Sequence, residues 1–176
     1  MAAIDVGPGA TDRDGSMTYG YTALTLGNPA NDTGILTSVE FWANSSMSSV
    51  KVGTFYGSST TWTNRDGATI GSVTAGSKQT FSGLSIDVST SDVIGTYWSA
   101  GTLDRDAADT DGRVYKTGDY FGAGTVSGYT AKGESLSLYG TGATAAVGWT
   151  GKIWGVTNPA KIWGIPVANI AKVGGI

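Results

Sequence analysis

The chain has 176 residues, of which 40% are hydrophobic, 14% are charged and 28 are glycine, with a net charge of −3. This length suits one ordinary domain with an appendage, and the composition is too apolar for a disordered protein. Cysteine and histidine are both absent, which excludes disulfides, thiol nucleophiles, imidazole bases and the commonest transition-metal ligands.

Short stretches rich in Val, Ile, Thr, Tyr and Phe follow one another along the first 140 residues, with Gly, Asn, Asp and Ser between them. The opening, MAAIDVGPGA, lacks the basic and apolar regions of a secretory signal. The predicted strands are AIDVG (3–7, at an edge), YTALTLGN (21–28), TSVEFWAN (37–44), SVKVGTFYG (49–57), TIGSVT (69–74), FSGLSIDVST (81–90), DVIGTYWSA (92–100), GRVYKTG (112–118) and ESLSLYG (134–140).

Period-two alternation assigns faces to several of these strands. Val39 and Phe41 share one face, and Leu84, Ile86 and Val88 share another. A helical period with a cap at each end does not occur in the sequence. Eight or nine short antiparallel strands in about 140 residues predict an all-β fold of two packed sheets, a jelly-roll β-sandwich over residues 1–140.

The composition changes after this body. Residues 141–151 are small and uncharged, which is typical of a flexible linker. Residues 152–176 follow as a tail with Lys152, Lys161 and Lys172 and no acidic residue, whereas all 14 acidic residues lie in 1–134. The acidic body argues against nucleic-acid binding. Prolines, glycines and lysines interrupt the tail too often for a membrane-spanning helix.

The tail is also too apolar to stay uncovered. It reads K-I-W-G-V, then K-I-W-G-I, then K-V-G-G-I. Such repeats bury their apolar faces by stacking, within one chain or between chains. The residues expected to make assembly contacts are Lys152, Ile153, Trp154, Val156, Lys161, Ile162, Trp163, Ile165, Ile170 and Val173. The alternative is that the tail folds back as strands of its own domain.

The tail resembles the K-x-x-G-[VI] repeats that end many structural proteins of phages and environmental viruses, with Trp154 and Trp163 where such repeats often have Asn. The body, with GSVTAGSKQTF, DVIGTYWSAGTLDRD and ESLSLYG, is similar to the lectin-like jelly-roll domains attached to these repeats. The resemblance implies a virion protein of tail-fibre or appendage type. Its expected partners are further copies of itself, in a trimer, other virion proteins and a host-surface glycan.

Two stretches carry candidate ligand sites. LDRDAADTDGR places Asp104, Asp106, Asp109 and Asp111 within eight residues, a set of oxygen ligands that suits Ca²⁺. The alternative is a solvated turn in which these acids pair with neighbouring arginines.

SSTTWTNRDG offers Trp62, Asn64, Arg65 and Asp66 on an expected loop, where an aromatic face beside polar groups suits a sugar ring. The alternative is that Trp62 plugs an open end of the sandwich.

Catalysis has few candidate groups. Only Glu40 and Glu134 join the aspartates as potential acids or bases. These few groups predict that the protein is not an enzyme, and the resemblance implies a virion structural protein that displays a glycan-binding domain. The alternatives are a free carbohydrate-binding module or lectin, and an extracellular filament subunit assembled by strand addition.

Overall fold

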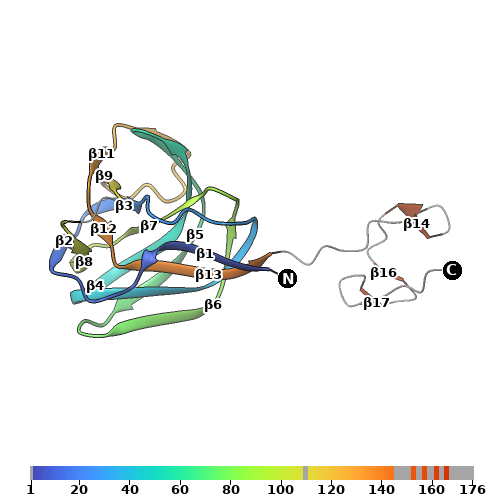
Figure 1. Ribbon diagram of the computed structural model, residues 1–176, viewed down its shortest axis with the longest axis horizontal. Coiled ribbons are helices and arrows are strands. Elements are labelled where there is room, and N and C mark those ends of the chain that lie inside the picture. The colour runs from blue at the N-terminus through green and yellow to red at the C-terminus, as the bar shows by residue number, and fades with distance from the viewer. Residues whose placement is uncertain are drawn as a thin grey trace. The chain divides into compact units, whose positions relative to one another are not determined.

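The computed structural model describes residues 2–108 and 111–144, and four two-residue strands between 152 and 166. Residues 2–144 form one compact unit, called the body below, and residues 145–176 group separately. All regular secondary structure in the described residues is β-strand (Figure 1). The strands of the body are β1 (Ala3–Gly9), β2 (Gly15–Thr18), β3 (Tyr21–Thr25), β4 (Gly34–Ser58), β5 (Thr61–Val73), β6 (Lys78–Val88), β7 (Val93–Tyr97), β8 (Ala100–Asp106), β9 (Arg113–Thr117), β10 (Thr125–Ser127), β11 (Thr130–Lys132), β12 (Ser135–Leu136) and β13 (Leu138–Thr144).

Strand β4 belongs to two sheets. Its first part pairs with β6 and β13, and β13 pairs with β1, so the first sheet runs β6-β4-β13-β1. Its last part pairs with β5 and β7, giving a second sheet in the order β10-β5-β4-β7-β3-β9-β11. Every pairing is antiparallel. Between the two parts, the strand changes direction through several register shifts and Ser49 at φ 52°.

The main core lies between the two sheets. Ile4 of β1, Leu36 and Phe41 of β4, Ile86 of β6 and Leu138 of β13 are all at most 1% exposed. The alternation predicted for β4 and β6 is confirmed, because Val39 and Phe41 are buried in this core with Ile86 and Val88, and Leu84 packs against it. The expected antiparallel all-β sandwich is therefore confirmed.

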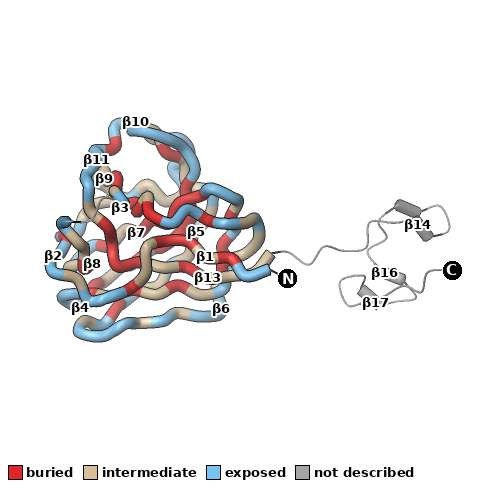
Figure 2. Tube along the Cα trace, in the orientation of Figure 1, coloured by how far each residue is buried: buried red, intermediate tan, exposed pale blue. Residues whose placement is uncertain are grey.

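A second apolar cluster covers the other face of the second sheet. It contains Leu24, Phe55, Trp62, Val93, Val114 and Tyr129. The second sheet is strongly curved. Strand β10 pairs with β5 at one edge, and strand β11 pairs with β9 at the other. Along the chain, β10 and β11 are separated by only Gly128 and Tyr129. Figure 2 shows buried segments under the arch formed by these strands. The central strands of this sheet are thus covered on both faces.

The body extends to Thr144, four residues beyond the predicted boundary. Strand β13 lies between β1 and β4 in the first sheet, and the backbone N–H of Thr144 donates to the carbonyl of Ala2 at 3.1 Å. Of the predicted linker, residues 141–144 belong to this strand, and residues 145–151 lie outside the described residues. A Cβ added to Gly142 would lie 2.0 Å from the carbonyl oxygen of Ile35, so the neighbouring strand leaves no room for a side chain.

In the tail, the structure describes two short antiparallel pairs. Strand β14 (Lys152–Ile153) pairs with β15 (Val156–Thr157), and β16 (Lys161–Ile162) pairs with β17 (Ile165–Pro166). Six of the expected assembly residues lie in these strands: Lys152, Ile153, Val156, Lys161, Ile162 and Ile165. The others, Trp154, Trp163, Ile170 and Val173, lie outside the described residues.

Candidate binding groove

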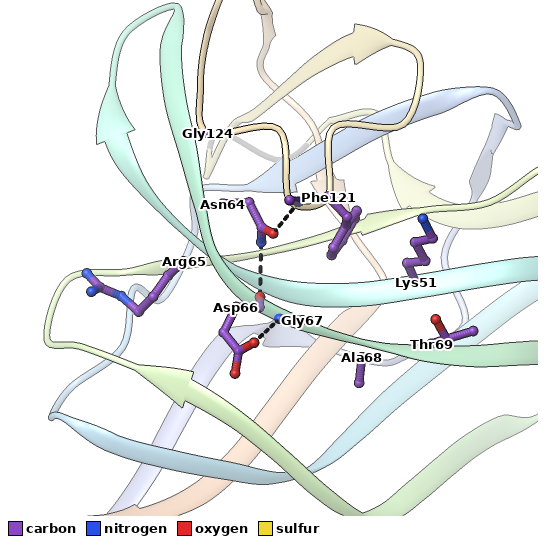
Figure 3. A pocket seen from close by; sticks show the side chains of 10 residues that line it. Lys51, Asn64, Arg65, Asp66, Gly67, Ala68, Thr69, Phe121 and Gly124 are labelled. Atoms are coloured by element: carbon purple, nitrogen blue, oxygen red, sulfur yellow. Dashed lines mark hydrogen bonds between the residues drawn. The ribbon is translucent and has the colours of Figure 1, made fainter.

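A groove of about 540 Å³ lies beside β5 in the body. Strands β4 and β5 supply its floor, and the turn around residue 121 supplies a wall (Figure 3). The lining residues are Lys51, Asn64, Arg65, Asp66, Gly67, Ala68, Thr69, Phe121, Gly122 and Gly124. Three of the four residues predicted as a glycan site, Asn64, Arg65 and Asp66, line this groove.

The wall exists because a pair of glycines makes room for a ring. Gly53 of β4 and Gly67 of β5 face each other across the sheet. A Cβ on either would lie 2.8–2.9 Å from ring atoms of Phe121. The ring also meets Phe55 edge to face, with centroids 5.3 Å apart. Phe121 therefore packs directly on the backbone of the sheet, and its half-buried ring borders the groove.

Asn64 and Asp66 hold the groove together. The Asn64 side-chain amide donates to the carbonyls of Thr54 and Asp66 at 3.1 and 3.0 Å and accepts from the N–H of Gly122 at 2.9 Å. The carboxylate of Asp66 accepts from the backbone N–H groups of Gly67 and Asp87, each at 2.8 Å. These side chains tie β4, β5, β6 and the turn after β9 to one another.

The two cationic residues of the groove each have an acidic partner. The Arg65 guanidinium pairs with both carboxylate oxygens of Asp92, which is 1% exposed, and lies 4.7 Å from the ring centroid of Tyr56. The hydrogen bond to Asp92 raises the pKa of Arg65 above its usual value. Figure 3 shows Arg65 directed away from Phe121. Lys51 pairs with Asp119.

Trp62 differs from the prediction. It lies in strand β5 rather than on a loop, it is 6% exposed, and it belongs to the second apolar cluster. Its indole Nε1–H donates to the carbonyl of Ser59 at 3.1 Å. Because the residue is only 6% exposed, the ring offers little surface for a sugar to stack on. It packs in the second apolar cluster, on a face of the second sheet.

Three of the four aspartates predicted to bind calcium are described, and these three do not form one cluster. Asp104 lies in β8, is 1% exposed and accepts from the backbone N–H of Arg13 at 3.2 Å. Asp106 pairs with Arg13 at 3.8 Å, and the Ser135 hydroxyl lies 3.5 Å from Asp111. Asp109 lies outside the described residues. Among the residues that the structure describes, no three acidic side chains are grouped to hold a metal ion.

Several groove residues were not predicted. Phe121, Gly122 and Gly124 come from the stretch GDYFGAG, whose aromatic pair between glycines was a usable signal. Lys51 was assigned to a strand face without a role. Both contributions depend on contacts between distant parts of the chain, which local alternation does not encode.

Comparison with known proteins gives no match, either to a protein-family model or to a curated protein. Within the part of the chain that the structure describes, there is no helix long and apolar enough to cross a membrane.

Proposed function

We propose that the protein is a non-enzymatic structural component of a virion, of appendage or capsid-surface type, in which the repeat tail joins subunits and the body is displayed. The observation that carries this proposal is the repetition of one hairpin in the tail. Lys152 and Ile153 pair with Thr157 and Val156, and the second repeat places Lys161 and Ile162 in the same register.

Such short hairpins need neighbours. Two-stranded pairs of two residues each are not stable alone in water, because they bury too little surface. The repeats carry Ile, Val and Trp, whose burial contributes about 1.5–3 kcal/mol per large side chain. Stacking against copies from other subunits would supply that burial, and a closed trimer is the expected assembly, with the lysine ammonium groups left in water.

The state of the carboxylates supports a non-enzymatic role. Glu40 pairs with Lys78 at 3.1 Å, and Glu134 is shared by Arg105 and Arg113 at 2.5–2.6 Å. A glycosidase needs two carboxyl groups facing one sugar ring. These two glutamates are instead neutralised by neighbouring cations.

The assembly is tested with the full chain. Sedimentation velocity should show a closed oligomer at micromolar concentration, and Trp154→Ser with Trp163→Ser should shift it towards monomer. The matched control, Tyr19→Ser with Tyr56→Ser, removes two exposed aromatic rings from the body and should leave the mass unchanged. A monomeric wild-type chain would favour the free lectin reading, and an open polymer would favour the filament.

The displayed body would bind a host glycan in the groove beside Phe121. An apolar ring next to backbone and hydroxyl groups is a usual arrangement for sugar recognition. Thr69 is an exposed groove residue on β5, and Thr80 is an exposed residue of β6 outside the groove.

Thr69→Tyr should therefore fill the groove and abolish signals on a glycan array, whereas Thr80→Tyr should leave them unchanged. If both variants bound glycans equally well, the groove would not be the binding site. If the wild-type chain bound no glycan on the array, the proposal of glycan binding would be wrong.

A further inference from the structure

A second pocket, of about 220 Å³, opens among β2, β8, β3 and β9. Ser16 and Thr18 of β2, Tyr21 of β3, Arg105 of β8, and Arg113 and Tyr115 of β9 line it. Tyr21 and Tyr115 also pack against the main core, so the pocket lies on the face of the second sheet opposite the groove of Phe121. Its volume suits a group of about monosaccharide size rather than a long chain.

Two guanidinium groups meet one carboxylate here. Arg105 approaches Glu134 Oε1 at 2.6 Å through Nη1, and Arg113 approaches Oε2 at 2.6 Å through Nε and 2.5 Å through Nη2. The side chains of Arg105, Arg113 and Glu134 are 25%, 7% and 16% exposed. Two positive charges with one negative partner leave a surplus positive charge at the pocket, although the body as a whole is acidic.

Arg113 also has an unused donor. Its Nη1 is buried and has no hydrogen-bond partner among the described residues. A buried donor without an acceptor is destabilising, and more so when the group is charged. The guanidinium carbon lies 4.5 Å from the ring centroid of Tyr115, which offers a favourable face but no lone pair. The site therefore holds a charged donor for which the described residues supply no acceptor.

The remaining wall groups are suited to a small polar ligand. The rings of Tyr21 and Tyr115 meet edge to face, 5.5 Å between centroids, and fix an apolar wall. Ser16 and Thr18 bring hydroxyl groups. The Arg105 Nε–H donates to the carbonyl of Ser16 at 2.8 Å, which orients its guanidinium at the pocket.

We propose that this pocket binds an oxyanion group, a carboxylate, sulfate or phosphate ester carried by a small ligand such as an acidic monosaccharide, between Arg105 and Arg113. The guanidinium fork pairs with such oxygens through charge-assisted hydrogen bonds. The free Nη1 of Arg113 supplies a donor that Glu134 does not use. The inference does not depend on the assembly proposed for the tail or on the groove of Phe121.

Calorimetric titration of the full chain tests it, with sodium glucuronate, inorganic sulfate and inorganic phosphate as ligands and glucose as the neutral control. At least one anion should bind with a dissociation constant on the order of 1 mM or tighter, and glucose should bind at least about tenfold more weakly because it lacks the oxyanion. The strongest of the three anions identifies whether the pocket takes a carboxylate, a sulfate or a phosphate.

The variant Arg105→Gln removes the surplus charge while Glu134 stays paired with Arg113, so anion affinity should fall about tenfold or more. Lys78→Gln is the matched control, because Lys78 is also an ion-paired cation but lines neither this pocket nor the groove. It should bind the anion as the wild type does.

Arg113→Lys keeps the charge and removes the fork, and should also lose about tenfold. If this variant unfolds, as its melting curve would show, Arg105→Gln alone decides. Absence of anion binding at about 50 mM, which is far above the expected dissociation constant, would overturn the proposal. Equal affinity for glucose, or equal losses in Arg105→Gln and Lys78→Gln, would also overturn it.

Discussion

The two faces of the second sheet are covered in different ways. The face towards the first sheet carries Ala23, Val50, Val52 and Ile94, which pack in the main core. The opposite face carries the second apolar cluster, covered by the chain from residue 118 to 132. Antiparallel sheets often leave one face in water. Here the second face becomes a core because glycines in the sheet admit aromatic rings from a connecting segment.

The largest test of this comparison is Trp62→Ala. Truncating a large ring in the second apolar cluster should lower the free energy of unfolding by about 3–5 kcal/mol, as it would in a main core. Chemical denaturation measures this loss, and Tyr19→Ala, at a ring that is 54% exposed, serves as control. A loss under about 1 kcal/mol would mean that the second cluster is only a loose cover.

A smaller effect is expected for Gly67→Ala. Alanine normally stabilises a strand relative to glycine, because it reduces the freedom of the unfolded chain. At this position the added Cβ would meet Phe121 at 2.8 Å and the carbonyl oxygen of Val52 at 2.9 Å, so we expect a loss of about 1–3 kcal/mol. Chemical denaturation of Gly67→Ala, with Thr69→Ala as the control, shows whether the added methyl group stabilises or destabilises the fold. A stabilised Gly67→Ala would contradict the packing described.

The next expected effect is a pH dependence of the stability, caused by Asp104 in β8. Burial raises the pKa of Asp104 above its ordinary 3.8. The folded protein then holds this proton more tightly than the unfolded chain, so stability falls as pH rises from about 3.8 through the folded pKa and remains lower above it.

Asp104→Asn should remove this fall and leave the protein at least as stable as the wild type near neutral pH. Melting temperatures measured from about pH 3 to about pH 7 test this, with the more exposed Asp106→Asn as control. A variant that is destabilised more at neutral than at acid pH would contradict the assignment.

The smallest effect is spectroscopic. Burial raises the pKa of Tyr129, in the second apolar cluster, to about 12. Ultraviolet titration should therefore show one tyrosine ionising well after those near the ordinary value of about 10, and Tyr129→Phe should remove that late step. If Tyr19→Phe removed the late step instead, the late ionisation would belong to an exposed tyrosine, and the assignment to Tyr129 would be wrong.

Much of the fold follows from alternation. The buried positions of β6 and of the first part of β4 were readable because one face meets the core and the other meets water. Alternation is less informative where both faces are covered. In the last part of β4, Val50, Val52 and Phe55 are all fully buried, although period-two alternation would put Phe55 on the opposite face from the two valines. Strands β2, β8, β10 and β11 were missed, because their short polar sequences are held by partners distant in the chain.

The candidate sites were less predictable than the fold. The stretch from Asn64 to Asp66 was expected on a loop, but it lies in strand β5 and lines the groove. Trp62, two residues before Asn64, is buried. Arg105 in β8, Arg113 in β9 and Glu134, just before β12, meet from separate stretches of the chain. Neighbouring charges in the sequence pointed instead to calcium, since spacing along the chain carries no information on burial or on ion pairing.

We propose that the body folds on its own and that the tail joins subunits. A chain truncated after Thr144, where strand β13 ends, tests it by light scattering combined with thermal melting. We expect the full chain to form a closed oligomer and the truncated chain to be a monomer with an unchanged, cooperative melting transition. A truncated chain that unfolds, or that keeps the mass per particle of the full assembly, would contradict this account.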